Sequence, residues 1–268
     1  MEQSINLTSI GNARELGGFS VGDAVVKHGV LLRTASLTSI SDEDMDRLTK
    51  EYHLYAVIDL RMSSERKHAP DMDIPGVENL FFPVVELEDY EDGGVQMGRA
   101  LADPDVDRFE IMKIAVQAGM LDEHLYERFL FSDRGKKAYR DMFATLLELP
   151  EGRSVLWHCT DGKDRAGVAS MLVLAALGAD RDTILRDYML TNEYNKTKID
   201  KHREVLRGSP LTPEYREIAM FGYGAVYEKY MINALTAMED RYGSPTGYIS
   251  EELGVGEPEL EELHRKFC

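Results

Sequence analysis

Short apolar runs alternate with amphipathic stretches along the first two thirds of this 268-residue chain. The apolar runs predict strands, and the longest are typical of strands buried on both faces. They lie at residues 19–21, 25–26, 30–33, 54–60, 80–85 and 154–158. Apolar residues at helical spacing predict a helix after Ser41, with Ser41 and Asp44 as a capping box. Further helices are predicted at 135–149 and 165–177. This alternation predicts an α/β fold with a mainly parallel central sheet flanked by helices.

Two regions depart from the alternation. Residues 86–132 begin with the acidic run ELEDYEDGG and continue with apolar residues at helical spacing, namely Phe109, Met112, Val116, Met120, Leu121, Leu125 and Phe129. They predict a helical insertion with a small core of its own. Residues 180–267 are helical in pattern, with one long amphipathic stretch at 213–241. Because the composition changes nowhere along the chain, we predict a single domain over residues 1–268 that includes the insertion.

The charge balance narrows the range of partners. Aspartate and glutamate number 48 and lysine and arginine 31, which gives a net charge of −17. This excess opposes binding to nucleic acids and to anionic membranes. No apolar run is long enough to span a membrane, and the N-terminus lacks the pattern of a secretion signal. We therefore expect no integral membrane association and a cytoplasmic protein, with signal-independent secretion left open, and we make no prediction of oligomeric state.

The cysteines and histidines indicate neither a disulfide nor a metal site. Only Cys159 and Cys268 are present, and Cys268 is the terminal residue, so a structural disulfide is not expected. The seven histidines form no cluster with cysteine or aspartate at the spacing of metal ligands. The sequence therefore predicts no metal and no other cofactor.

The most informative stretch is SVLWHCTDGKDRAG at 154–167, where a predicted strand ends at His158, a turn carrying Gly162 follows and a predicted helix begins at Arg165. Backbone N–H groups in such a loop, with the positive end of the helix dipole, suit a phosphate dianion. Cys159 would lie at the base and Arg165 at the rim. A free thiol has a pKa of about 8.5, so a nucleophilic cysteine needs about 4 kcal/mol of anion stabilisation. A helix terminus supplies at most about 2 kcal/mol, so the loop amides and Arg165 would supply the rest.

At these residues the chain resembles the cysteine-dependent phosphatases. The loop HCTDGKDRAG is similar to that of the bacterial tyrosine-phosphatase family, which includes secreted lipid and protein phosphatases of pathogens. The family's other motifs have counterparts in NARELGG at 12–18, LLRT at 31–34, IDLR at 58–61, YGS at 242–244 and GYI at 247–249. The resemblance therefore covers nearly the whole chain. Glu15 replaces the usual aspartate, and Ala166 replaces the usual threonine, whose hydroxyl donates to the cysteine sulfur in most cysteine phosphatases.

The resemblance implies a cysteine-phosphatase fold and a metal-independent phosphomonoesterase that acts through phosphocysteine. Cys159 would attack phosphorus while Arg165 binds two phosphate oxygens. The rest of the phosphoryl group would lie against Thr160, Asp161, Gly162 and Lys163. The leaving oxygen needs a proton, and Asp164 is the first candidate, because this family and the myotubularin lipid phosphatases have aspartate there. The alternative is that Asp164 only orients Arg165 through a salt bridge.

The resemblance also suggests roles for the insertion and for Lys163. Residues 86–132 would form a helical lid over the loop, and Asp89 and Asp92 in its acidic run are alternative proton donors, although a solvated charge run is the simpler explanation for them. Lys163 would bind a second phosphate, as in phosphoinositide-active relatives, or would be a lysine that faces solvent.

Other residues near the predicted site have structural explanations. His158 is expected to bond to loop carbonyls and support the thiolate. Asp59 and Arg61, at a strand end, belong to the site or make hydrogen bonds to the loop. Arg14 and Arg33 are expected to brace the N-terminal segment. A basic cluster is a helix face in solvent or a receptor for an acidic head group, and it comprises Lys196, Lys198, Lys201, His202 and Arg203.

The predicted substrate is a phosphotyrosine protein or a phosphoinositide. Lys163 and the resemblance of the loop to that of the myotubularins favour a lipid or dual activity, whereas the net charge opposes membranes. A catalytically weak phosphate-recognition module is the alternative, but recognition alone needs no thiolate. Rhodanese-like sulfur transfer and arsenate reduction also use a cysteine in an anion loop, yet they do not explain the other motifs or the pair formed by Asp164 and Arg165.

Overall fold

The computed structural model describes residues 3–103, 106, 108–209 and 211–268. Its main sheet has the strand order β1-β4-β7-β5-β6, in which β1 is antiparallel to β4 and the other neighbours are parallel. The strands are β1 (Arg14–Glu15), β4 (Leu31–Thr34), β5 (Leu54–Asp59), β6 (Glu78–Phe81) and β7 (Ser154–His158). A second sheet pairs β2 (Ser20–Val21) with β3 (Ala24–Val25). The predicted α/β fold with a mainly parallel sheet is confirmed.

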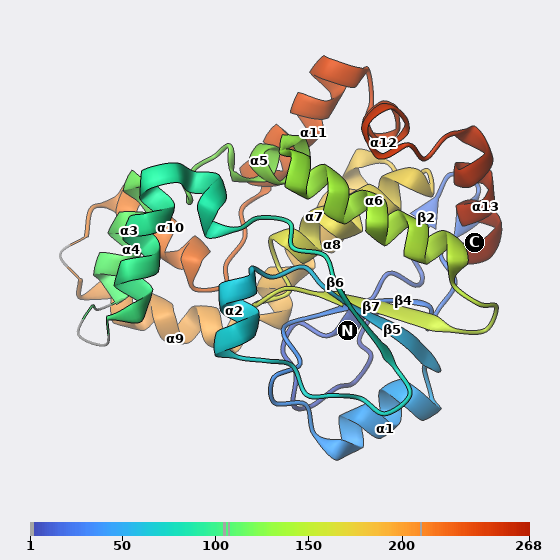
Figure 1. Ribbon diagram of the computed structural model, residues 1–268, viewed down its shortest axis with the longest axis horizontal. Helices are drawn as coiled ribbons and strands as arrows, with labels where there is room; N and C mark the ends of the chain where they lie inside the picture. Colours follow the sequence, from blue (N-terminus) through green and yellow to red (C-terminus); the bar gives the residue numbers. More distant parts are fainter. Residues whose placement is uncertain (1–2, 104–105, 107, 210) are drawn as a thin grey trace.

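Helices cover both faces of the main sheet, with α1 below it and α6 and α7 above it in Figure 1. The helices are α1 (Asp42–Lys50), α2 (Ser63–His68), α3 (Glu91–Ala102), α4 (Arg108–Gln117), α5 (Leu125–Phe131), α6 (Asp133–Glu148), α7 (Arg165–Ala176), α8 (Arg181–Tyr194), α9 (Lys196–Arg207), α10 (Pro213–Gly222), α11 (Glu228–Tyr242), α12 (Pro245–Leu253) and α13 (Glu257–Phe267), with the 3-10 turn η1 (Leu87–Tyr90) before α3. None of the helices in the described ranges is long and apolar enough to cross a membrane.

Alternate residues of the central strand β7 enter opposite cores. Val155 and Trp157 belong to the large apolar cluster shared with α6 and α7, whereas Leu156 belongs to the cluster shared with α1. Successive side chains of a strand point to opposite faces, so burial on both faces requires the continuous apolar run that the sequence shows.

The register of the sheet places four strand ends side by side. Thr34 of β4 pairs with His158 of β7, His158 pairs with Asp59 of β5, and Asp59 pairs with Phe81 of β6. These are the carboxyl ends of parallel strands, where ligands of α/β proteins usually bind. The loop that begins at Cys159 therefore emerges between the segments that follow β4 and β5.

The insertion, residues 86–132, is helical over η1, α3, α4 and α5. Met97, Ala115 and Met120 form an apolar cluster separate from the main core. Two of the predicted apolar residues, Leu125 and Phe129, join the main core instead. Met112 packs against α9 and α10, and the side chain of Phe109 lies outside the described part of the structure.

Three predicted elements differ from the observed ones. The strand predicted at 80–85 is observed as β6 (Glu78–Phe81), because Pro83 has no N–H to donate to a strand ladder. The stretch at 213–241 forms two helices, α10 and α11, which are separated at Gly224, where φ is +113°. Ser41 caps α1, but the carboxylate of Asp44 accepts from the backbone of Thr8 and Ser9, so the capping box is incomplete.

Candidate active site

Cys159 follows β7 directly and is 2% exposed, at the base of a loop that ends where α7 begins at Arg165. The neighbouring strands hold both sides of the loop. Leu60, after β5, donates its N–H to the carbonyl of His158 at 3.0 Å, and Ser36, after β4, donates to the carbonyl of Thr160 at 3.2 Å. The loop is therefore fixed by three adjacent strands of the sheet.

Two side chains hold the loop from behind. The Asn12 amide Nδ2 donates to the carbonyls of Asp161 at 3.1 Å and Gly162 at 2.9 Å, and Arg33 Nη2 donates to the Gly162 carbonyl at 2.8 Å. Arg14 donates to Asn12 Oδ1, which leaves Nδ2 for the loop. Because a peptide group is planar, carbonyls drawn to one side turn the adjoining N–H groups to the other.

A buried ion cluster anchors these donors. Arg14 and Arg33 are both 0% exposed and share the carboxylate of Asp187 in α8, with N–O distances of 3.0 and 2.5 Å. Burial, with repulsion by Arg14, lowers the pKa of Arg33 to about 10 despite attraction by Asp187. The sequence predicts that Arg33 braces the N-terminal segment, whereas its observed partners are Gly162 of the loop and Asp187 of α8.

Gly162 is the one loop position where glycine is required by the backbone and by its surroundings together. Its φ is +65°, and a Cβ atom there would lie 2.3 Å from the carbonyl oxygen of Thr34. The left-handed conformation alone disfavours other residues. The close approach of β4 then leaves no room for a side chain.

Arg165 is held by Glu65 of α2, a residue that sequence reasoning missed. Arg165 Nη1 and Nη2 lie 2.5 and 2.9 Å from the two Glu65 oxygens, and Thr160 Oγ1 also donates to this carboxylate. Burial opposes both charges, but their mutual attraction raises the pKa of Arg165 and lowers that of Glu65 to about 2. The pair therefore stays ionised at neutral pH.

Asp164, at the N-cap of α7, is held by two donors. The Tyr126 hydroxyl donates to Asp164 Oδ1 at 2.7 Å, and Lys163 Nζ lies 2.7 Å from Oδ2. Lys163 is 3% exposed, and its ammonium lies 3.7 Å from the centroid of the Phe221 ring. The prediction that Lys163 faces solvent is therefore wrong, because its charge is directed into the protein.

A cavity of about 310 Å³ opens between the loop and the insertion. Asp164, Arg165 and Glu65 form its polar end. The remaining walls are apolar or aromatic and come from Met62, Val85, Leu87, Tyr90, Met97, Ala115, Met120, Leu121, Leu125 and Phe129. This arrangement can bind an anion at one end and an apolar group at the other.

Comparison with known proteins agrees with this geometry. The profile of the tyrosine phosphatase family matches residues 5–268. The chain belongs to the tyrosine phosphatase family. A Cupriavidus necator protein, whose name places it among the tyrosine-protein phosphatases, is 28% identical over 254 residues, which are 94% of this chain and 85% of that protein. A triple specificity protein phosphatase of Mycobacterium tuberculosis is 30% identical over 133 residues, 47% of this chain and 48% of its own length. A Nostoc commune tyrosine-protein phosphatase is 23% identical over 87% of this chain and 72% of its own.

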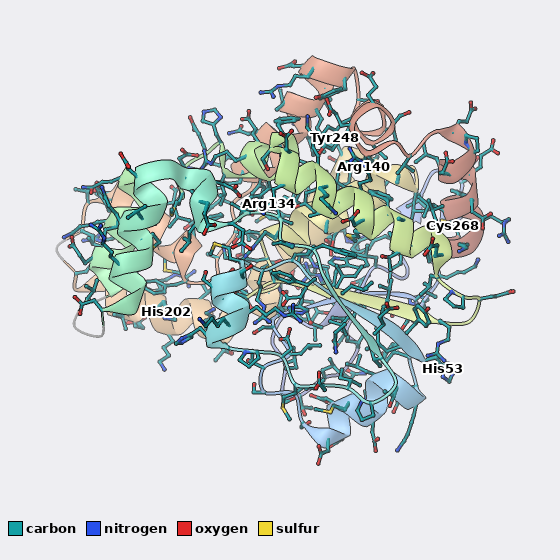
Figure 2. All side chains as sticks on the ribbon, viewed as in Figure 1. His53, Arg134, Arg140, His202, Tyr248 and Cys268 are labelled. Carbon is teal, nitrogen blue, oxygen red and sulfur yellow. The ribbon has the colours of Figure 1, made fainter. Side chains whose placement is uncertain are left out.

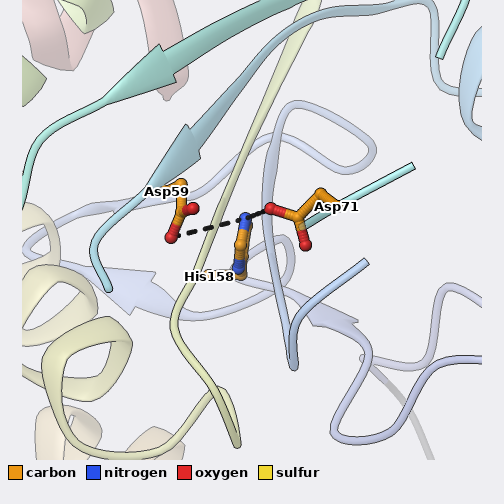
Figure 3. A group of neighbouring side chains, drawn as sticks. All are labelled: Asp59, Asp71 and His158. Carbon is orange, nitrogen blue, oxygen red and sulfur yellow. Dashed lines mark ion pairs between the residues drawn. The ribbon is translucent and has the colours of Figure 1, made fainter. Parts of the chain in front are cut away.

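Beneath the loop of this phosphatase, Asp59, Asp71 and His158 are the group of described side chains that could together hold a metal ion (Figure 3). Arg61 already bridges the two carboxylates. Its Nη2 lies 2.9 Å from Asp59 Oδ2 and 2.6 Å from Asp71 Oδ2. A divalent cation would have to displace this guanidinium, so the donor set does not fit a metal.

The other predicted residues lie at the margin of the phosphatase site. Asp89 is 2.7 Å from Arg134 Nε and borders a different cavity, and Asp92 is exposed on α3. Lys198 of α9 is 2.5 Å from Asp161 Oδ1, so this member of the basic cluster contacts the loop instead of only facing solvent. Both cysteines are free, and Cys268 lies at the end of α13, on the opposite side of Figure 2 from His202 of α9.

Replacement of Gly162 by alanine tests the shape of the loop. We expect Gly162→Ala to lower the free energy of unfolding by about 1–2 kcal/mol because of the positive φ. The contact with the Thr34 carbonyl is expected to lower it by about 1–3 kcal/mol more. Gly152→Ala is the matched control, because Gly152 has φ +73° and nothing within 4 Å of its Cβ position. Urea unfolding measures both variants. Equal losses in the two would show that β4 does not confine the loop.

Proposed function

We propose that this phosphatase hydrolyses phosphotyrosine in proteins through a phosphocysteine intermediate, without a metal ion. The observation that carries the proposal is the position of Cys159, which is buried at the base of the loop. Asn12 and Arg33 donate hydrogen bonds to the loop carbonyls from the side away from the cavity. The loop amides of Thr160, Asp161, Gly162 and Lys163 would bind the phosphoryl oxygens together with Arg165.

The reaction would proceed in two displacements. In the first, the Cys159 thiolate attacks phosphorus, the ester P–O bond breaks, and Asp164 gives its proton to the leaving oxygen. In the second, water attacks the phosphocysteine and returns a proton to Asp164, the S–P bond breaks, and inorganic phosphate leaves. The position of Asp164, at the wall of the cavity beside Arg165, supports this role.

The cavity supports a protein substrate over a phosphoinositide. An engineered cavity of about 150 Å³ binds benzene, so about 310 Å³ gives ample space for the ring of phosphotyrosine. Among the described residues that line this cavity, Arg165 is the only cation, and Lys163 is engaged by Asp164. A phosphoinositide head group would bring further phosphates to a wall that offers them no positive charge. In this proposal the insertion acts as a lid that binds the leaving group.

Replacement of Cys159 tests the mechanism. Purified protein is expected to hydrolyse an aryl phosphate in the presence of EDTA, and Cys159→Ser is expected to reduce kcat by roughly 10⁴- to 10⁶-fold, as for other catalytic nucleophiles. Cys268→Ser is the control and keeps wild-type activity. Loss of turnover on chelation, or near-normal turnover of the Cys159 variant, would exclude the thiolate mechanism. Greater activity on phosphoinositides than on phosphotyrosine peptides would exclude the substrate assignment.

A comparison of leaving groups tests Asp164. Asp164→Asn is expected to slow alkyl phosphates by about 10²- to 10⁴-fold, but aryl phosphates with acidic leaving groups far less, since these need little protonation. Asp89→Asn is the comparison variant and is expected to slow both substrates equally or not at all. Equal losses on both substrates in Asp164→Asn would assign Asp164 to positioning alone.

The absence of a hydroxyl at Ala166 predicts a slow second step. The alternative hydroxyl of Thr160 is bonded to Glu65. A hydrogen bond to a charged group contributes about 1.5–3 kcal/mol, so hydrolysis of phosphocysteine is expected to be slower by roughly 10- to 150-fold. Stopped-flow assays of an aryl phosphate should show a burst, and Ala166→Thr should raise steady-state turnover without changing the burst rate. A linear time course together with unchanged turnover in Ala166→Thr would contradict this expectation.

A further inference from the structure

A buried polar network beneath Cys159 has no part in the two displacements described above. His158 is 0% exposed, Asp59 is 4% and Arg61 is 1%, and the side chain of Asp71 is 15% exposed. Figure 3 shows the ring of His158 between the two carboxylates. Asp59 comes from the end of β5 and Asp71 from the segment after α2, so the sheet and its following loop surround the ring on both sides.

Both nitrogens of the His158 ring face oxygen atoms that only accept hydrogen bonds. Nδ1 lies 3.2 Å from the carbonyl oxygen of Cys159, and Nε2 lies 3.1 Å from Asp71 Oδ2 and 4.0 Å from Asp59 Oδ1. Among the described residues, Nε2 makes no hydrogen bond of good geometry. Its contact with Asp71 is close enough for an ion pair if the ring is charged. A neutral imidazole has an N–H group on only one of its two nitrogens, so its other nitrogen would direct a lone pair at one of these oxygens.

The charges of the network balance only if His158 is protonated. Arg61 compensates one carboxylate, with Nε 2.9 Å from Asp59 Oδ1 and Nη2 2.6 Å from Asp71 Oδ2. The second carboxylate then needs another cation, because an unpaired buried charge is costly. Arg66 lies 4.0 Å from Asp59, but its side chain is 46% exposed, so it compensates little. Burial favours a neutral Asp71, yet His158 and Arg61 together lower the pKa of this carboxyl.

We propose that Asp71 is a positioning residue that keeps His158 as an imidazolium, whose charge favours the thiolate of the adjacent Cys159. The peptide between the two residues places the ring next to the loop, and Nδ1–H donates to the Cys159 carbonyl. The charge state of His158 stands independently of the proposed function, and its effect on Cys159 matters to the reaction only if Cys159 is the nucleophile.

Nitrogen-15 NMR of histidine-labelled protein tests the charge state directly. The chain has seven histidines, and His158 is assigned as the signal pair missing from the spectrum of His158→Gln. At pH 7.5 both ring nitrogens are expected to have the chemical shifts of an imidazolium ion. In Asp71→Asn the ring is expected to be neutral at the same pH, because the amide NH₂ can donate to Nε2. Asp73→Asn, on the same segment but exposed, is the control and leaves the ring charged.

Alkylation by iodoacetamide tests the effect on Cys159. Mass spectrometry of the Cys159 peptide gives the pH midpoint of its reaction, and the Cys268 peptide serves as the internal control. Asp71→Asn is expected to move the Cys159 midpoint upward by about one unit or more, and Asp73→Asn to leave it in place. A neutral His158 in the wild type, a charged ring in Asp71→Asn, or an unmoved Cys159 midpoint would each overturn the proposal. Circular dichroism confirms that the variants are folded, and activity is not needed for either readout.

Discussion

Carbonyl oxygens that faced the cavity would repel a phosphate dianion, and two side chains behind the loop prevent this. Asn12 and Arg33 draw the carbonyls of Asp161 and Gly162 backward, which turns the adjoining amides toward the anion. The arrangement depends on the order of the sheet, because β4 carries Arg33 and lies directly beside β7. Gly162 permits the close approach of the two segments, so the loop has its shape before any ligand binds.

The positive potential at the loop is local and comes from buried groups. The chain as a whole carries a net charge of −17. Behind the loop, however, Arg14 and Arg33 share a single carboxylate from Asp187, which leaves one excess positive charge there. Salt screens buried charges much less than exposed ones. An anion can therefore bind at this loop although the surface of the protein is acidic, and no basic surface patch is required.

The sequence predicts the parts of the site whose residues are contiguous. Five residues separate Cys159 from Arg165 across one turn, and the observed β7 and α7 agree with the ranges predicted for them. Glu65 could not be found in this way, because it meets Arg165 across 100 residues of sequence and resembles an ordinary helix-capping residue. It is brought to the loop because α2 follows β5, which pairs with β7. The alternative in which Lys163 faces solvent is wrong for the same reason, since Phe221, from a distant helix, covers its charge.

The insertion and the sheet contribute different properties to the site. The loop is tied to three strands, whereas the opposite wall of the cavity is built by the insertion, with flexible Met97 and Met120 side chains. Apolar walls exclude water and so strengthen the electrostatic effects of Asp164 and Arg165. Methionine adapts its shape to what it contacts, so in the proposed reaction this wall would fit different leaving groups while the loop holds the phosphoryl group. Because Met97 and Met120 pack in a cluster separate from the main core, under the proposed function substitutions there would alter the range of substrates without disturbing the loop.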